Sequence, residues 1–274
     1  MLTAKFLNLF ANHHWAIELG AWRALISRLP GMLAAIPMSP VAAVSPSIAA
    51  HGKIGVLRMS GPIVKGIDPA LAEYFGLCSV DKVHRAADLV AERGITHLVL
   101  DLDTPGGMVL GLAEAADRLL NLREVGVTLT AYSETWACSA GYYLGAACNE
   151  FVAAPSAIIG SVGTIIEGTD DSKLWERIGL KPEYFVTEGS EAKLFGAMGL
   201  PWSDEAKSFF QGIVNARGAE FKDFVSQHRP GIAREDMNGM YWAASDAPAG
   251  YVDHTHANGR PISTLGDLLS ILTL

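Results

Sequence analysis

Ser139 and the Pro-Gly-Gly sequence at residues 105–107 carry the residue types that acyl-transfer chemistry requires. Each lies where an apolar stretch gives way to small residues and then to a helical pattern, which predicts a strand, a tight turn and a helix. A Pro-Gly-Gly turn leaves backbone N–H groups facing a cleft. A serine at a helix N-terminus presents its hydroxyl where the helix dipole favours negative charge. The two turns therefore predict an oxyanion hole beside a serine nucleophile.

The base that would activate Ser139 is less clear from the residues. None of the eight histidines lies between residues 98 and 227, which carry both turns, although a histidine distant in sequence can still complete a triad. A lysine can serve if it is neutral, which for an exposed amine at pH 7 costs roughly 4.6 kcal/mol. The apolar residues after Lys193 could desolvate its amine, whereas Glu188 and Glu191 would keep it charged. The residues alone leave the base open.

The elements that must position these groups alternate between strands and helices. This order predicts an α/β fold with a mainly parallel sheet, beginning near Gly52. The predicted strands are residues 54–59, 96–102, 127–132, 151–154 and 184–187. The predicted helices are the segment from an N-cap at Ser79 to Arg93, residues 109–122, the segment after Ser139, residues 171–179, and a long helix from Ser203 to about His228.

The N-terminal residues differ from this body. Residues 15–29 have the pattern of an amphipathic helix, and a Pro-, Ser- and Ala-rich linker follows. Charged residues interrupt the apolar ones, so we expect neither a membrane span nor a secretory signal. The chain is predicted to consist of an extension, residues 1–48, and a catalytic domain, residues 49–274, in a soluble cytoplasmic protein.

Composition excludes several classes of protein. With 274 residues, 50% of them hydrophobic and 18% charged, the chain can bury a sizeable core. A formal charge of −8 argues against nucleic-acid binding. Its three cysteines, Cys78, Cys138 and Cys148, have no metal-ligand spacing and are odd in number, so we expect neither a metal site nor a disulfide framework. We expect buried thiols and no cofactor.

Five segments together resemble the protease IV, or signal peptide peptidase A, family of serine peptidases. Within it, the chain resembles the prohead proteases that tailed bacteriophages use in capsid maturation. The matching segments run in order within about residues 52–272: the strand and turn at 98–107, the serine segment at 139–143, the Gly-Ser-Val-Gly stretch at 154–163, the lysine segment at 189–193, and residues 241–253.

This resemblance implies a fold related to Clp protease and crotonase, and a Ser–Lys dyad. Ser139 would be the nucleophile and Lys193 the general base. The N–H groups of Gly107 and Ala140 would form the oxyanion hole, and the Ser161 hydroxyl would orient the lysine amine. Threonine occupies position 104, where the family commonly has serine in this turn. The lysine segment is more acidic than is usual for the family, which leaves Lys173 and Lys181 as alternative bases.

The resemblance also implies a homo-oligomer that cleaves scaffold, portal or capsid proteins in the host cytoplasm or within proheads. Three other functions stay open. A crotonase-like acyl-CoA enzyme would need a catalytic carboxylate near the oxyanion hole and a site for the CoA phosphates, and the sequence indicates neither. A non-catalytic assembly or scaffold protein could retain the fold. A bacterial signal-peptide peptidase would act at a membrane, and the sequence indicates no anchor.

Overall fold

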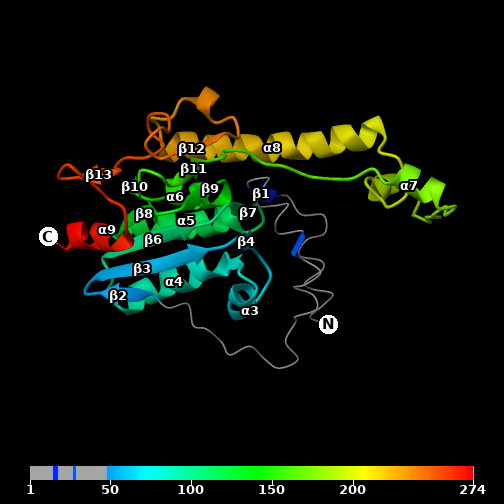
Figure 1. Ribbon diagram of the computed structural model, residues 1–274. Coiled ribbons are helices and arrows are strands. Elements are labelled where there is room, and N and C mark those ends of the chain that lie inside the picture. Colours follow the sequence, from blue (N-terminus) through cyan, green and yellow to red (C-terminus); the bar gives the residue numbers. More distant parts are fainter. Residues whose placement is uncertain (1–14, 18–26, 29–47, 274) are drawn as a thin grey trace.

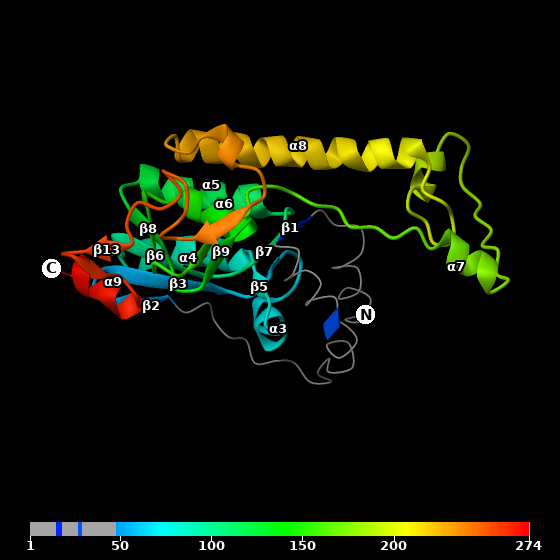
Figure 2. The ribbon, with the colours of Figure 1, turned by 45° about the horizontal axis from the view of Figure 1, so that its top comes forward.

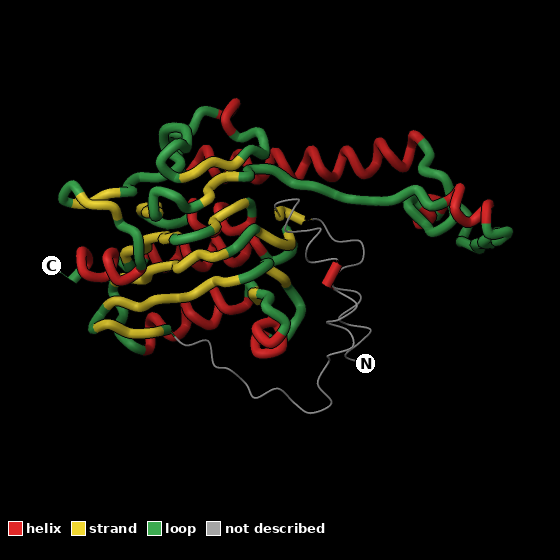
Figure 3. Tube along the Cα trace, in the orientation of Figure 1, coloured by secondary structure: helices red, strands yellow, loops and turns green. Residues whose placement is uncertain are grey.

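The structure is a computed structural model that describes residues 15–17, 27–28 and 48–273. A five-stranded sheet of order β10-β8-β6-β3-β2 forms the centre of the body, and its strands lie side by side in Figure 3. All neighbours are parallel except β2 and β3. The strands are β2 (Ala49–His51), β3 (Ile54–Ser60), β6 (His97–Asp103), β8 (Thr128–Ser133) and β10 (Glu150–Ala153). The predicted α/β class with a mainly parallel sheet is confirmed.

Alternating side chains on the central strands build a core on each face of the sheet. Along β6, Leu98, Leu100 and Leu102 pack into the larger core, whereas Val99 contributes to the smaller one. The larger core includes side chains from helices α4 (Asp81–Glu92), α5 (Leu112–Glu124) and α6 (Ala140–Ala146). The smaller core includes Leu268 of α9 (Leu265–Leu272). Helices therefore flank both faces, as Figure 1 shows.

Two smaller sheets continue from the carboxyl ends of the central strands. The first has the order β1-β7-β4-β5, and the second β12-β11-β9. Their strands are β1 (Trp15–Ile17), β4 (Ile63–Val64), β5 (Cys78–Ser79), β7 (Gly106–Met108), β9 (Trp136–Cys138), β11 (Ile158–Gly160) and β12 (Tyr241–Ala243). The remaining elements of the body are helix α3 (Pro69–Tyr74), the 3-10 helix η2 (Arg234–Asp236), and a hairpin of β13 (His256–Ala257) and β14 (Arg260–Pro261).

Helix α8 (Asp204–His228) lies along the body and projects beyond it (Figures 1 and 2). The predicted cap is present, because the Ser203 hydroxyl accepts the Ala206 N–H at 3.1 Å. Phe221 and Val225 anchor the helix in the larger core. The preceding residues 166–203, which we call the arm, include α7 (Ser172–Arg177) and the 3-10 helix η1 (Glu191–Leu194). No residue of the arm is buried.

Two predicted elements differ in the structure. Residues 184–187 form no strand, because they lie in the arm without a partner strand, and Phe185 is 93% exposed. Trp15–Ile17 form strand β1 instead of the start of a helix, because the edge of β7 pairs with them. The rest of that predicted helix, apart from Ser27 and Arg28, lies outside the described residues, as does the linker that follows it.

A smaller difference concerns α4. The residue before its first turn is Val80, not Ser79, because Ser79 pairs in β5 with Val64 of β4. The predicted glycine at the other end is present, since Gly94 has φ +61°. Among the described residues, no helix is long and apolar enough to cross a membrane.

Candidate active site

Backbone hydrogen bonds hold the two predicted turns against each other. The Thr104 N–H donates to the Trp136 carbonyl at 2.8 Å, and the Cys138 N–H donates to the Thr104 carbonyl at 3.1 Å. The turn after β6 and the turn after β9 therefore lie side by side. Helix α6 also packs closely here, because a Cβ on Gly141 would meet the Thr104 methyl at 2.4 Å. The sequence thus brings the Pro-Gly-Gly turn to the predicted nucleophile.

Ser139 occupies a backbone conformation that is rare for a residue with a side chain, with φ 53° and ψ −116°. Its N–H donates to the Gly160 carbonyl at 2.8 Å, and its carbonyl accepts the Tyr143 N–H at 2.9 Å. These bonds fix the turn between β9 and α6. Ser139 is 1% exposed, and its hydroxyl has no hydrogen-bond partner among the described residues. A serine on a strained strand-to-helix turn is typical of hydrolase nucleophiles.

The Pro-Gly-Gly turn favours Gly107 over Gly106 as the oxyanion donor. The Thr104 hydroxyl accepts the Gly106 N–H at 3.1 Å, so that N–H is engaged within the turn. At position 107 only glycine fits, because a Cβ would lie 2.0 Å from the Ile63 carbonyl oxygen. Ala140 is the first residue of α6, so its N–H has no acceptor within the helix. The roles of Gly107 and Ala140 stay predictions that this geometry supports.

A charged cluster that sequence reasoning missed supports the same turn. Arg58 of β3 pairs with Asp101 at 2.7 Å and with Asp103 at 3.3 Å, and Ser60 also donates to Asp103. Burial raises the pKa of Asp101, and the Arg58 guanidinium opposes that shift. Arg58 and Asp101 are register partners of parallel strands. The available signal was the spacing of Asp101 and Asp103, which places both carboxylates on one face of β6.

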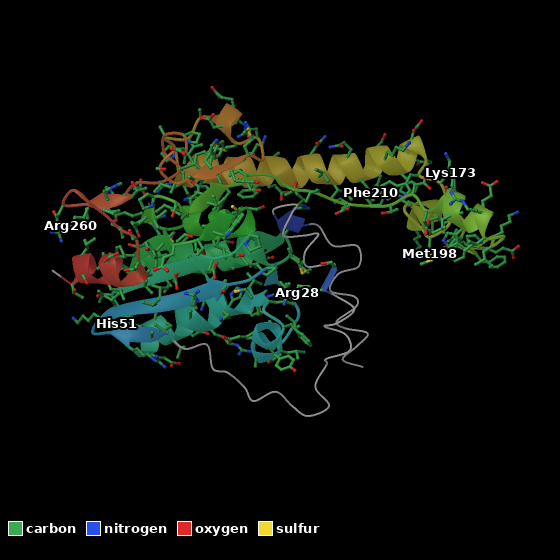
Figure 4. The ribbon with its side chains drawn as sticks, in the orientation of Figure 1. Arg28, His51, Lys173, Met198, Phe210 and Arg260 are labelled. Carbon is green, nitrogen blue, oxygen red and sulfur yellow. The ribbon has the colours of Figure 1, made fainter. Side chains whose placement is uncertain are left out.

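Lys193 does not lie beside Ser139 within the chain. It belongs to η1 in the arm, where it is exposed, so the apolar residues after it do not desolvate its amine. Lys173 and Lys181 are also exposed residues of the arm. Figures 1 and 2 show α7 at the far end of the arm, away from α6, and Figure 4 labels Lys173 and Met198 there. The structure therefore places all three candidate lysines on the element that leaves the body.

Ser161 lies close to the nucleophile turn. It is 9% exposed with φ 57°, and its N–H donates to the Met240 carbonyl at 2.6 Å. The preceding residue, Gly160, accepts the Ser139 N–H. A surface pocket of about 550 Å³ begins at Ser161 and runs along α8, where Asn215 and Lys222 line it. Because the pocket begins at Ser161, next to the residue that accepts the Ser139 N–H, it is a candidate subsite for part of a substrate.

The segment at residues 241–253 locks α6 and α8 to the sheet. Arg229, which is 6% exposed, pairs with Asp253 at 2.7 Å and donates to the Gly250 carbonyl. Asp253 also accepts the Phe151 N–H at 2.7 Å, and the Tyr142 hydroxyl donates to the Tyr251 carbonyl. Burial alone would raise the pKa of Asp253, but its hydrogen bonds with Arg229 and the Phe151 N–H hold it below its ordinary value.

The cysteines behave as the sequence predicts. Cys78, Cys138 and Cys148 are buried free thiols. Burial raises the pKa of Cys78 to about 11 and that of Cys148 to about 12, so these thiols are poor nucleophiles at neutral pH. Cys138 precedes Ser139, and its thiol lies 3.5 Å from the Ile158 carbonyl oxygen.

Comparison with known proteins gives results that agree with this geometry. Residues 121–265, which include Ser139, Ser161 and Lys193, match the family model for Peptidase family S49. Over 153 residues, covering 56% of this chain and 43% of the relative, the chain is 29% identical to the "Probable protease SohB" of Haemophilus influenzae.

Two further relatives widen the range of known functions. "Serine protease SPPA, chloroplastic" of Arabidopsis thaliana is 24% identical over 215 residues, covering 77% of this chain and 32% of the relative. "Capsid assembly protease C" of Escherichia phage lambda is 29% identical over 176 residues, covering 64% of this chain and 39% of the relative. The chain spans about half the length of the SohB relatives that it matches.

Proposed function

Because the chain belongs to peptidase family S49, we propose that it is a serine endopeptidase in which Ser139 is the nucleophile and Lys193 the general base. The observation that carries the proposal is the Ser139 turn. It combines a strained backbone, a buried hydroxyl without a partner among the described residues, and hydrogen-bond contact through Cys138 with Thr104, the residue before Pro105. Together these features hold a nucleophile beside donors for an oxyanion.

The proposed reaction gives each of these groups one role. A neutral Lys193 amine accepts the Ser139 proton while the Ser139 oxygen attacks the carbonyl carbon of the scissile peptide bond. The negative charge that develops on the carbonyl oxygen is stabilised by the N–H groups of Gly107 and Ala140. The protonated lysine then delivers its proton to the leaving amine. Water hydrolyses the resulting ester in a second cycle of the same proton transfers.

We propose that the lysine reaches the serine from a second copy of the chain. The arm carries Lys193 away from its own α6, and none of its residues is buried. Several of its large apolar side chains are exposed: Leu174, Ile178, Leu180, Tyr184, Phe185 and Met198. Docking of this surface on another copy would bury those side chains and desolvate the amine, which lowers the pKa of a lysine. A homo-oligomer is therefore part of the proposed mechanism.

We propose that the substrates are proteins of a phage head, namely scaffold, portal or capsid proteins, cleaved in the host cytoplasm or within proheads. Support comes from the similarity to the capsid assembly protease of phage lambda. The similarity to SohB and SPPA proteins supports only the broader statement that the substrate is a polypeptide. A non-catalytic assembly protein that retains this fold is the alternative function, and the experiment below separates the two.

The test is intact-mass analysis of an unfolded protein, and of head proteins encoded by neighbouring genes, after incubation with the purified chain. Wild type should produce discrete fragments, and Ser139→Ala should reduce the rate by at least ~10³-fold. The matched control is Ser133→Ala, which removes another buried hydroxyl without a hydrogen-bond partner among the described residues. This control should cleave at close to the wild-type rate.

Equal fragmentation by wild type and Ser139→Ala would assign the activity to another protein and contradict the proposal. Absence of cleavage by a folded, oligomeric wild type on every substrate would favour the non-catalytic assembly protein. Fragments from the unfolded protein but from no head protein would support peptidase activity and contradict the proposed substrate class.

A further inference from the structure

Strand β1 covers the edge of the strand that carries the predicted oxyanion donor. Trp15, Ala16 and Ile17 pair antiparallel with Met108, Gly107 and Gly106, respectively. On its other side β7 pairs with β4. The sheet order β1-β7-β4-β5 therefore makes β1 the outermost strand, and Figure 1 shows it beside β7. Without β1, the edge of β7 would be open to another extended peptide.

Strand β1 has the N-to-C direction expected for the part of a substrate that precedes the bond cleaved by Ser139. From Trp15 to Ile17 its partners run from Met108 back to Gly106, toward the turn that contains Thr104. Thr104 bridges to Ala137, two positions before Ser139. An extended substrate with this polarity would place its acyl-side residues along β7 and its next peptide bonds toward Ser139. Strand addition of this kind is a general way to bind a peptide without reading every side chain.

The pairing is short enough to be reversible. The ladder between β1 and β7 spans three residue pairs. A backbone hydrogen bond contributes about 1 kcal/mol net, so such a ladder is weak by itself. Covalent attachment to the body favours the pairing, because it raises the local concentration of the segment at this edge.

We propose that residues 15–17 are a tethered occupant of the acyl-side substrate groove, so that the chain's own N-terminal segment competes with protein substrates for the edge of β7. The inference rests on the proposed function for the identity of the competing ligand. The claim that residues 15–17 occupy the edge of β7 rests on the strand pairing alone. A competitor that must leave before substrate binds raises the apparent KM to the intrinsic value divided by the fraction of time the groove is free, and it leaves kcat unchanged.

The kinetic test compares two deletions in the full oligomeric protein. Deletion of residues 1–20 removes β1 and should lower the KM for an unfolded protein substrate by threefold or more, with kcat unchanged. Deletion of residues 1–12 is the matched control, since it shortens the same terminus and retains β1, and it should keep the wild-type KM. Equal KM values for both deletions and the wild type would overturn the proposal.

A binding test decides the question without relying on catalysis. A fluorescent peptide of residues 11–21 is titrated into Ser139→Ala in two forms, one full-length and one lacking residues 1–20. Fluorescence anisotropy should give a Kd at least threefold lower for the shortened form, and a scrambled peptide should bind neither. Equal affinity for both forms, or no binding to the shortened form, would overturn the inference even if proteolysis is confirmed. Tighter binding to the shortened form would support it even if no proteolysis is found.

Discussion

The body and the arm of this protein divide the proposed catalytic groups between two very different environments. Ser139 lies in the body, is 1% exposed, and is fixed by backbone hydrogen bonds to Gly160 and Tyr143. Lys193 lies in the arm, is exposed, and belongs to a short 3-10 helix with no buried neighbour in the arm. The proposed nucleophile is therefore in place before any partner binds, whereas the proposed base is not.

This difference shows what the single chain can and cannot do. Its folded body supplies the nucleophile turn and the candidate oxyanion donors, because both follow from strand pairing. The arm is organised locally, since Asp171 accepts the Gly199 N–H at 2.7 Å and the Trp175 indole N–H at 2.9 Å. That local order presents an apolar surface and leaves it uncovered in the single chain. Activity should therefore depend on association.

Removal of the proposed base should have the largest effect of the changes that follow. We expect Lys193→Ala to lower the cleavage rate of an unfolded protein by about 10³-fold or more, because an unactivated serine is a weak nucleophile. Thermal unfolding should stay at the wild-type temperature, since the side chain is exposed. Lys53→Ala, which removes an exposed lysine of the body, is the control and should keep full activity. Retained cleavage in Lys193→Ala would move the role to Lys173 or Lys181.

A substitution in the body should reduce activity by distorting the Pro-Gly-Gly turn. In Gly107→Ala the new Cβ would lie 2.0 Å from the Ile63 carbonyl oxygen, so β7 must shift. We expect a loss of ~10²–10³-fold in kcat, the usual effect of losing one oxyanion donor. Gly212→Ala on α8 is the matched control, because its Cβ meets nothing within 4 Å. Similar kcat values for the two variants would contradict the role of Gly107.

The exposed surface of the arm gives a milder test. Phe185 is 93% exposed, so Phe185→Ser should leave the unfolding temperature of the dissociated chain unchanged. If the arm docks on another copy, the substitution removes roughly 1.5–3 kcal/mol of apolar burial, which corresponds to about 10–150-fold weaker association. Analytical ultracentrifugation of the variant against the wild type measures this. An unchanged association constant would show that Phe185 lies outside the interface.

The smallest expected effect concerns the free energy of unfolding at acid pH. The pKa of Asp253 is held below its ordinary value of about 3.9, so its ion pair with Arg229 stabilises the fold above that pH. The stabilisation is lost as pH falls through the lowered pKa. Asp253→Asn should cost about 2 kcal/mol at pH 7, less than for a fully buried pair because Asp253 is one-third exposed.

Urea unfolding of the wild type and of Asp253→Asn at pH 7, pH 4 and pH 3 provides the measurement. The difference in unfolding free energy between the two proteins should shrink as the pH falls. A constant difference across this range would show that the Asp253 carboxylate contributes nothing to the loss of stability at acid pH.

Much of the body could be predicted because its signals are local. Alternation along β6, the Ser203 cap and the glycine after α4 each follow from a few neighbouring residues. The strand at residues 184–187 was wrong because β-propensity requires a partner strand, which the arm does not offer. The helix predicted from Trp15 was wrong at its start because tertiary pairing with β7 overrides a short helical pattern.

The site could be predicted only in part. The serine and glycine turns were visible because small residues between an apolar strand pattern and a helical pattern indicate a tight turn. The Thr104 hydrogen bond to the Gly106 N–H is local, since it spans two residues of one turn. The Arg58 cluster instead depends on contacts between strands that are distant in sequence, which sequence spacing does not specify. The remoteness of Lys193 was invisible for the same reason. The order of residues places Lys193 after Ser139 in the chain but does not specify where the arm lies relative to the body.

The most direct test of the account mixes two inactive variants. Ser139→Ala supplies Lys193, and Lys193→Ala supplies Ser139, so only an oligomer that contains both can form a complete dyad across copies. After the two proteins are dissociated together and reassembled in equal amounts, random mixing predicts about one-quarter of the wild-type cleavage rate. Each variant treated alone should stay inactive. No recovery from reassembled mixed oligomers would contradict a dyad shared between copies.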